Sequence, residues 1–255
     1  MLLERFKRWR EARILQRHAL PDDAWQAAVT ALPLLHGLTA DELMRLRKLA
    51  TLFLYRKNVM AAEGYRLSEM VRLKIAAQAC LPILNLGLEC YSGWVSVIVY
   101  PGEFVPGHEY TDEAGVVHID RAPMIGESWQ RGPVILSAAD VEYSGAADGV
   151  NVVIHEFVHK LDMLNGDADG FPPLHRGMSA AAWARAFTLA YEDFCGRVDA
   201  GSVTVIDPYA AENPAEFFAV VSEVFFEKPR VLLAEYPKVY RQLADFYLQD
   251  PVSRI

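Results

Sequence analysis

Two histidines and a glutamate near the middle of the chain have the types and spacing of a metal-dependent hydrolytic centre. They form the pattern HExxH as His155, Glu156 and His159. Residues four positions apart on an α-helix lie about 40° apart around its axis, so both imidazoles leave the same face. Two ring nitrogens placed in this way can ligate one Zn²⁺ ion. Glu156 can then act as the general base for a water molecule that the metal activates.

A zinc catalyst also needs a third protein ligand and an open coordination position. The extended pattern HExxHxxGxxH would supply a third histidine, but residues 160–165 contain neither glycine nor histidine. A glutamate on a later helix is the other source. Glu216 opens an apolar helix 57 residues after His159, and Glu223 and Glu212 are the alternatives. Glu216 also fits the capping-box position after Asn213, which is a purely structural role.

The HExxH residues need a buried helix, and their neighbours predict one. Val153, Ile154 and Phe157 are large and apolar, and no proline or glycine interrupts residues 151–165. We expect the helix to begin near Asp148, as its N-cap, and to continue to about Leu164.

The remaining patterns predict helices first, then a small sheet, then further helices. A capping box at Thr39 and Glu42 opens one helix, and another runs from about Ser68 towards Pro82. Strands are expected at 94–100, 115–119 and 133–138, and later helices at about 179–197, 214–227 and 229–249. This order indicates an α+β fold, mainly helical with a small mixed sheet. We expect an N-terminal helical region, 1–90, and a catalytic domain, 91–255, packed as one compact unit.

Composition restricts the class of protein. The chain has 255 residues, of which 52% are hydrophobic and 23% charged, as in ordinary globular domains. Its net charge of −8 argues against direct binding of nucleic acid. The longest uncharged apolar stretch, 75–88, is too short for a transmembrane helix, and the first residues lack the apolar region of a secretory signal. With only three cysteines, these features predict a cytoplasmic protein.

The segments HEFVHKLD (155–162) and YAAENPAEFFAVVSEVFF (209–226) resemble the Mlc titration factor A family of bacterial zinc metallopeptidases. The likeness extends to GPVILSAADV (132–141) and through most of the chain. Members of that family are gluzincins, whose catalytic core is related to the anthrax lethal factor protease. The resemblance implies a gluzincin-like core with one zinc ion per chain, and Glu216 as its third ligand. It also implies that the phenol of Tyr209 donates a hydrogen bond to the oxyanion of the reaction.

Other residues near these motifs have supporting roles in this interpretation. Asp162 and Glu223 are placed to hydrogen-bond the ligating imidazoles, as ligating histidines usually require. A solvated Asp162 near the end of its helix is the alternative. In gluzincins a strand beside the zinc pairs with the extended substrate, and an interior strand is the alternative here. The residues expected to bind substrate in this way are Val134, Ile135, Leu136 and Ser137.

Two functions are therefore expected from the sequence. The first is a zinc metallopeptidase with aminopeptidase-like activity on short peptides, which the resemblance implies. The second is a regulatory protein that binds and inactivates the Mlc transcriptional repressor of glucose uptake, with secondary or no peptidase activity. Residues 1–18 carry a net charge of +4 among apolar residues and predict a basic amphipathic helix. This helix is a candidate docking element for a partner, unless its apolar stripe packs on its own domain.

Overall fold

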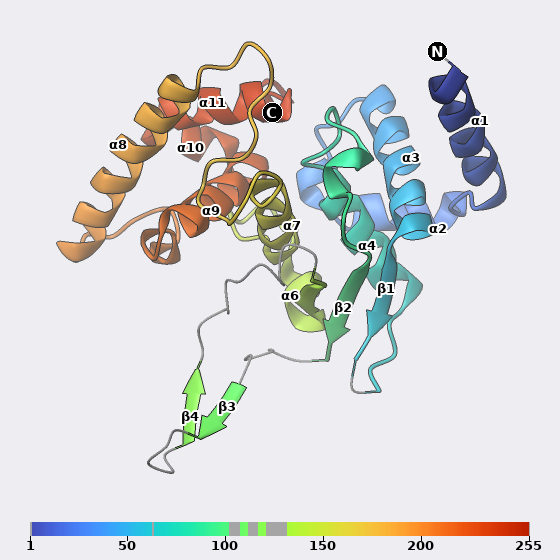
Figure 1. Ribbon diagram of the computed structural model, residues 1–255, viewed down its shortest axis with the longest axis horizontal. Coiled ribbons are helices and arrows are strands. Elements are labelled where there is room, and N and C mark those ends of the chain that lie inside the picture. The colour runs from blue at the N-terminus through green and yellow to red at the C-terminus, as the bar shows by residue number, and fades with distance from the viewer. Residues whose placement is uncertain (1, 63, 102–107, 112–116, 121–131, 255) are drawn as a thin grey trace.

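The computed structural model describes residues 2–62, 64–101, 108–111, 117–120 and 132–254 (Figure 1). The N-terminal part is helical, as expected. The predicted capping box at Thr39 is confirmed, because its hydroxyl accepts the N–H of Glu42 while the Glu42 carboxylate accepts the N–H of Thr39. Ser68 caps the next long helix in the predicted position. The elements are α1 (Leu2–Arg17), α2 (Asp22–Thr30), η1 (Pro33–Leu35), α3 (Ala40–Arg56), α4 (Glu69–Cys80) and η2 (Leu88–Tyr91).

A small parallel sheet lies beside these helices. Its strands are β1 (Asn58–Ala61), β2 (Ser96–Tyr100) and β5 (Val134–Ser137), in the order β1-β2-β5. In register, Val59 stands beside Val97 and Val97 beside Val134, and all three are buried. The antiparallel pairing occurs separately, between β3 (His108–Thr111) and β4 (Val117–Asp120). The mainly helical α+β class is therefore confirmed, with parallel and antiparallel pairs in two separate sheets. Part of the strand predicted at 115–119 lies outside the described residues.

The HExxH helix is α7 (Val152–Asp162), and it begins later than the sequence suggested. Its N-cap is Asn151, whose Oδ1 accepts the N–H of Ile154 at 2.9 Å. The expectation that Asp148 is the N-cap is wrong, because its carboxylate accepts the N–H of Val150 instead. Gly149 lies between them with φ +102°, outside the helical region, so the chain turns before α7 begins. The short helix α6 (Ala138–Tyr143) follows β5 directly.

The C-terminal part is a group of helices around α9 (Pro214–Glu227), whose predicted bounds are confirmed. One expectation about this part is wrong: the single helix predicted for 229–249 is broken at Tyr236. Pro237 has no N–H to donate, and Tyr236 takes φ −134° and ψ 70°, so a new helix starts there. The other elements are α8 (Ala180–Asp199), η3 (Pro208–Ala211), α10 (Pro229–Glu235), α11 (Pro237–Tyr247) and η4 (Pro251–Arg254).

Helix α7 lies between the two helical groups, with α4 on one side and α9 on the other (Figure 1). The ring of Phe157, on α7, packs against those of Phe53, Tyr91 and Trp94, with centroids 5.2–5.7 Å apart. One cluster of buried apolar residues extends from Ile14 to Tyr247. The division at residue 90 stays a prediction. Among the described residues, no helix combines the length and apolar character needed to cross a membrane.

Candidate metal centre

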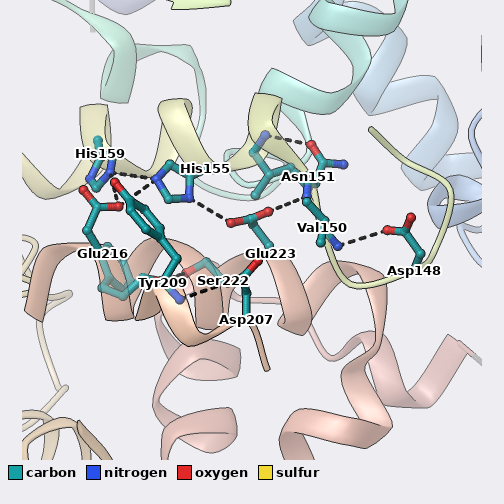
Figure 2. Close-up of polar contacts among 12 residues, drawn as sticks. Asp148, Val150, Asn151, His155, His159, Asp207, Tyr209, Glu216, Ser222 and Glu223 are labelled. Atoms are coloured by element: carbon teal, nitrogen blue, oxygen red, sulfur yellow. Dashed lines mark hydrogen bonds and ion pairs between the residues drawn. The ribbon is translucent and has the colours of Figure 1, made fainter. Parts of the chain in front are cut away.

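The two histidines of α7 point towards α9 (Figure 2). Their Nε2 atoms are 3.1 Å apart, and their ring centroids are 4.7 Å apart. Phe157, between them in sequence, points into the aromatic cluster and has no exposed surface. The amphipathic helix therefore fixes one face in the core and aims both imidazoles into the space that faces α9.

Glu216 meets the imidazoles from the first turn of α9. Asn213 caps this helix, since its Oδ1 accepts the N–H groups of Ala215 and Glu216 at 2.9 and 3.0 Å. The side chain of Glu216 is not used for capping. Its Oε2 lies 2.9 Å from Nε2 of His155 and 3.4 Å from Nε2 of His159. The structure thus brings together the two histidines and the glutamate that the sequence placed 57 residues apart.

These three side chains fit a divalent metal ion. One potential ligand atom from each lies within 4.8 Å of the others. Two imidazole nitrogens and one carboxylate oxygen are a donor set that zinc accepts. In addition, Oε2 of Glu216 is buried and has no hydrogen-bond or ion-pair partner among the described groups apart from the two imidazoles, and a cation at this point would satisfy it.

The electrostatics of the centre favour a positive charge. Burial by itself would lower the pKa of His155, but hydrogen bonds with Glu216 and Glu223 raise it to about 10. Burial would likewise raise the pKa of Glu216, but the two imidazoles hold it at about 2. The carboxylate of Glu216 therefore stays ionised beside the buried imidazoles, and such surroundings stabilise a cation.

The two other glutamates considered as third ligands lie elsewhere. Glu223, two turns along α9, places Oε1 at 2.8 Å from Nδ1 of His155, on the side of the imidazole away from His159 (Figure 2). Its other oxygen accepts the backbone N–H of Asn151. Glu212 is exposed and is not part of the group of potential ligands. The geometry therefore separates three candidates that the sequence left open.

The two residues expected to take part in the chemistry border this group. Glu156 is half-buried, and its charge raises the pKa of both His155 and Tyr209, so it lies near both. Tyr209 belongs to η3, where Asp207 accepts its N–H at 2.9 Å. Its ring centroid is 6.1 Å from that of His155, and half of its surface is exposed. Partial burial, together with Glu216 and Glu156, raises the pKa of Tyr209 to about 12.

Comparison with known proteins agrees with this geometry. The family model described as glucose-regulated metallo-peptidase M90 matches residues 6–248. This chain belongs to the M90 family. It is 40% identical over 239 residues to the Mlc titration factor A of Cronobacter sakazakii, covering 93% of this chain and 90% of that protein. It is also 41% identical over 252 residues to those of Salmonella gallinarum and Salmonella typhimurium, covering 97% of this chain and 92% of each relative.

The resemblance drawn from the sequence motifs is thus confirmed. Membership of the M90 family makes this chain a metallopeptidase-type protein, and such an enzyme requires a metal ion. Within the described part of the chain, His155, His159 and Glu216 are the group that can hold the ion.

Asp162 of this M90 chain is buried rather than solvated. One of its oxygens, Oδ2, accepts the N–H of Gly170 at 2.8 Å. Burial raises its pKa to about 6. Its Oδ1 and Nδ1 of His159 each lack a hydrogen-bond partner within the described part of the chain. The carboxylate thus supports the loop after α7, and its predicted role beside an imidazole stays a prediction.

The strand expected to bind substrate, β5, lies at the edge of the three-stranded parallel sheet. It pairs with β2, and no other described strand pairs with its second edge. The hydroxyl of Ser137 caps α6 by accepting the N–H of Asp140 at 3.2 Å, so this side chain already has a structural partner. An edge strand can add a peptide through backbone hydrogen bonds, and this role of residues 134–137 stays a prediction.

Sequence reasoning missed a set of buried polar residues behind the M90 centre. Asn151, Gln78 and Glu227 are each at most 5% exposed and are joined by hydrogen bonds of 2.7 Å. Burial raises the pKa of Glu227 to about 7. Two signals were present in the sequence. Asn151 directly precedes the apolar start of the HExxH helix, and Glu227 follows Glu223 by one helical turn on α9.

Proposed function

We propose that this M90 chain is a zinc-dependent peptidase that hydrolyses peptide bonds, with an aminopeptidase-like preference, in the cytoplasm. The convergence of His155, His159 and Glu216 carries the proposal. Two nitrogens and one oxygen match the ligand set of catalytic zinc sites, in which a fourth position is left for water or substrate. The sparse, unpaired cysteines support a reducing compartment.

Zinc bound by these ligands would polarise a peptide carbonyl and lower the pKa of water. Glu156 adjoins His155 in sequence, and its charge raises the pKa of both His155 and Tyr209. Its carboxylate accepts a proton from the attacking water and transfers it to the amine that leaves as the C–N bond breaks. The phenol of Tyr209 donates a hydrogen bond to the oxyanion that develops as water adds to the carbonyl. Glu223 holds Nδ1 of His155 and so leaves Nε2 for the metal.

The metal content of matched variants tests the ligand set. We expect about one zinc ion per wild-type chain by elemental analysis, and much less in Glu216→Ala, which loses one of three ligands. Glu212→Ala is the matched control, because this exposed glutamate comes from the same segment and should leave the zinc content unchanged. Equal zinc in Glu216→Ala and the wild type would remove Glu216 from the site. A wild type without zinc, prepared without chelators, would refute the proposal.

The kinetics of the same proteins test the chemistry. Glu156→Gln should retain zinc but lose activity by about 10²–10⁴-fold, the usual contribution of a general base. Wild-type activity in this variant would refute the mechanism. Peptides with free and with acetylated amino termini test the preference. Faster cleavage of the free form supports an aminopeptidase, and faster cleavage of the acetylated form supports an endopeptidase.

A second candidate function is the binding and inactivation of the Mlc repressor, suggested by the name of the relatives. The exposed aromatic residues of α1 favour it. Phe6 and Trp9 are 62% and 55% exposed and stack with centroids 5.8 Å apart. Ile14, further along the helix, is buried against the domain. The helix is thus anchored at one end and presents an aromatic, basic surface at the other.

A further inference from the structure

Asn151 uses all of its side-chain polar groups within the protein interior. Its Oδ1 accepts the N–H of Ile154 at 2.9 Å, which caps α7. Its Nδ2 donates two hydrogen bonds, to Oε1 of Gln78 and to Oε1 of Glu227, each 2.7 Å long. Its backbone N–H donates to Oε2 of Glu223. One buried residue therefore joins α4, α7 and α9.

This network reaches the metal centre through Glu223. One oxygen of that carboxylate accepts the N–H of Asn151, and the other lies 2.8 Å from Nδ1 of His155 (Figure 2). The backbone carbonyl of Asn151 also accepts the N–H of His155 at 2.9 Å. Asn151 thus acts on His155 both through the helix backbone and through the carboxylate behind the imidazole.

Asparagine suits this position for a chemical reason. The site requires one acceptor for the helix cap and two donors for the oxygens of Gln78 and Glu227, and a side-chain amide provides all three. Aspartate would keep the acceptor but lose both donors, and it would place a third carboxylate beside Glu223 and Glu227. Serine could cap the helix but is too short to replace the amide donors. Asn151, Gln78, Glu223 and Glu227 are at most 5% exposed, so water cannot replace a lost partner cheaply.

We propose that Asn151 is a positioning residue of the metal centre. Its side-chain amide, bound to Gln78 and Glu227, fixes the backbone whose N–H holds Glu223, and Glu223 in turn holds the imidazole of His155 with Nε2 aimed at the metal. This inference rests on the proposed function, because it needs the metal centre to exist. Partners that orient a ligating histidine typically change metal affinity by about 10–100-fold when they are removed, and we expect a loss of this size.

The test measures zinc affinity directly, on the full chain, by competition with a chromophoric chelator. Asn151→Ser retains an N-cap hydroxyl but removes both amide donors, and it should bind zinc about 10–100-fold more weakly. Ser179→Ala is the matched control for helix capping, because Ser179 caps α8 by accepting the N–H of Ala182. It should lose stability without losing zinc affinity. The absorption spectrum of the Co²⁺-loaded protein should change in Asn151→Ser and remain as in the wild type in Ser179→Ala.

A second pair of variants tests the same network without altering the helix cap. Glu227→Gln keeps an acceptor oxygen for Nδ2 of Asn151 and should bind zinc as the wild type does. Glu227→Leu removes that acceptor and should bind more weakly. Circular dichroism establishes that each variant is folded. If Asn151→Ser does not fold, the comparison of the two Glu227 variants decides the inference.

The outcomes separate this inference from the proposed function. If the wild type binds zinc and Asn151→Ser or Glu227→Leu binds it equally well, with an unchanged Co²⁺ spectrum, the positioning role is refuted while the metal site stands. If the wild type binds neither Zn²⁺ nor Co²⁺, both proposals fail. Weaker binding in Ser179→Ala as well would assign the effect to general destabilisation and also refute the positioning role.

Discussion

The phenol of Tyr209 is a half-exposed polar group beside the metal centre. Half of its surface is exposed, and its ring lies beside that of His155. We expect Tyr209→Phe to lower kcat by about 100-fold, as the loss of one oxyanion donor typically does, with a small effect on KM. Steady-state kinetics on a peptide substrate measure this change. Tyr55→Phe, an exposed tyrosine on α3, is the control and should be unchanged.

The raised pKa of Tyr209 adds a test of the same role. Because its pKa is about 12, the phenol keeps its proton through the neutral and moderately alkaline range. The ratio of wild-type kcat to that of Tyr209→Phe should therefore stay constant from about pH 7 to about pH 10. A ratio near one throughout this range would show that the phenol is not the donor, and a ratio that falls only as the pH rises would show that its pKa is lower than about 12.

The titration of Glu227 is expected to affect the free energy of unfolding rather than the activity. Burial raises its pKa from 4.5 to about 7, so between these values the folded chain holds a proton that the unfolded chain releases. The contribution of Glu227 to the free energy of unfolding is therefore fully present below about pH 4.5 and is lost as the pH rises to about 7. Glu227→Gln cannot titrate and should lack this decline. Urea unfolding at several pH values measures the difference, and parallel curves for the two proteins would contradict it.

At the scale of the elements, the loop after α7 packs against the start of α9, the helix that carries Glu216. Gly170 has φ +77°, and a Cβ at this position would lie 2.5 Å from the carbonyl oxygen of Pro214. Its N–H bonds Asp162, and its carbonyl accepts the indole N–H of Trp183 at 3.1 Å. The loop, α8 and the start of α9 are thus tied together at one residue.

We expect Gly170→Ala to lower the free energy of unfolding by more than about 2 kcal/mol, from backbone strain and from the collision with Pro214. It should also weaken zinc binding, because the first turn of α9 must shift. Denaturant unfolding and metal titration measure the two effects. Gly201→Ala is the matched control, since Gly201 has φ +67° with open space around its Cβ position. That variant should lose about 1 kcal/mol and keep its zinc affinity. Equal effects in the two variants would contradict the argument.

For the whole molecule, charge is distributed unevenly. Residues 1–18 carry +4 while the chain as a whole carries −8. The guanidinium carbon of Arg13 lies 5.4 Å from the centre of the Trp9 ring, so a cation and an aromatic face occur together on the outer side of α1. A partner with an acidic or apolar surface is the kind that such a helix attracts.

The double variant Phe6→Ser/Trp9→Ser tests this surface. Both side chains are more than half exposed, so the free energy of unfolding should change by less than about 0.5 kcal/mol per residue, and peptide hydrolysis should stay as in the wild type. Binding to purified Mlc repressor should be lost, as measured by calorimetry. Leu189→Ser, an equally exposed apolar residue on α8, is the control. Unchanged binding in the double variant would remove α1 from the partner surface.

Much of the fold followed from local chemistry. The capping box at Thr39, the start of a helix near Ser68 and the bounds of α9 were predicted because each depends on residues within a few positions of one another. The predicted N-cap of α7 was wrong because two residues of a suitable type, Asp148 and Asn151, lie only three positions apart. The helix begins after Asn151 because the side-chain amide of this residue donates hydrogen bonds to Gln78 on α4 and Glu227 on α9. These buried partners are more than 70 residues away in sequence.

The HExxH spacing by itself determined that two imidazoles and a carboxylate would share one helix, because helical geometry repeats every 3.6 residues. The apolar residues on the other face, among them Val153 and Phe157, determined that this helix would be buried. Spacing left Glu216, Glu223 and Glu212 as alternatives, since nothing local brings α7 and α9 together. Packing of the two helices decided that Glu216 meets Nε2, that Glu223 supports Nδ1 and that Glu212 stays exposed. The physical reason is that side-chain contacts between distant elements depend on how the apolar faces of those elements pack together. The residues next to a motif in sequence do not determine that packing.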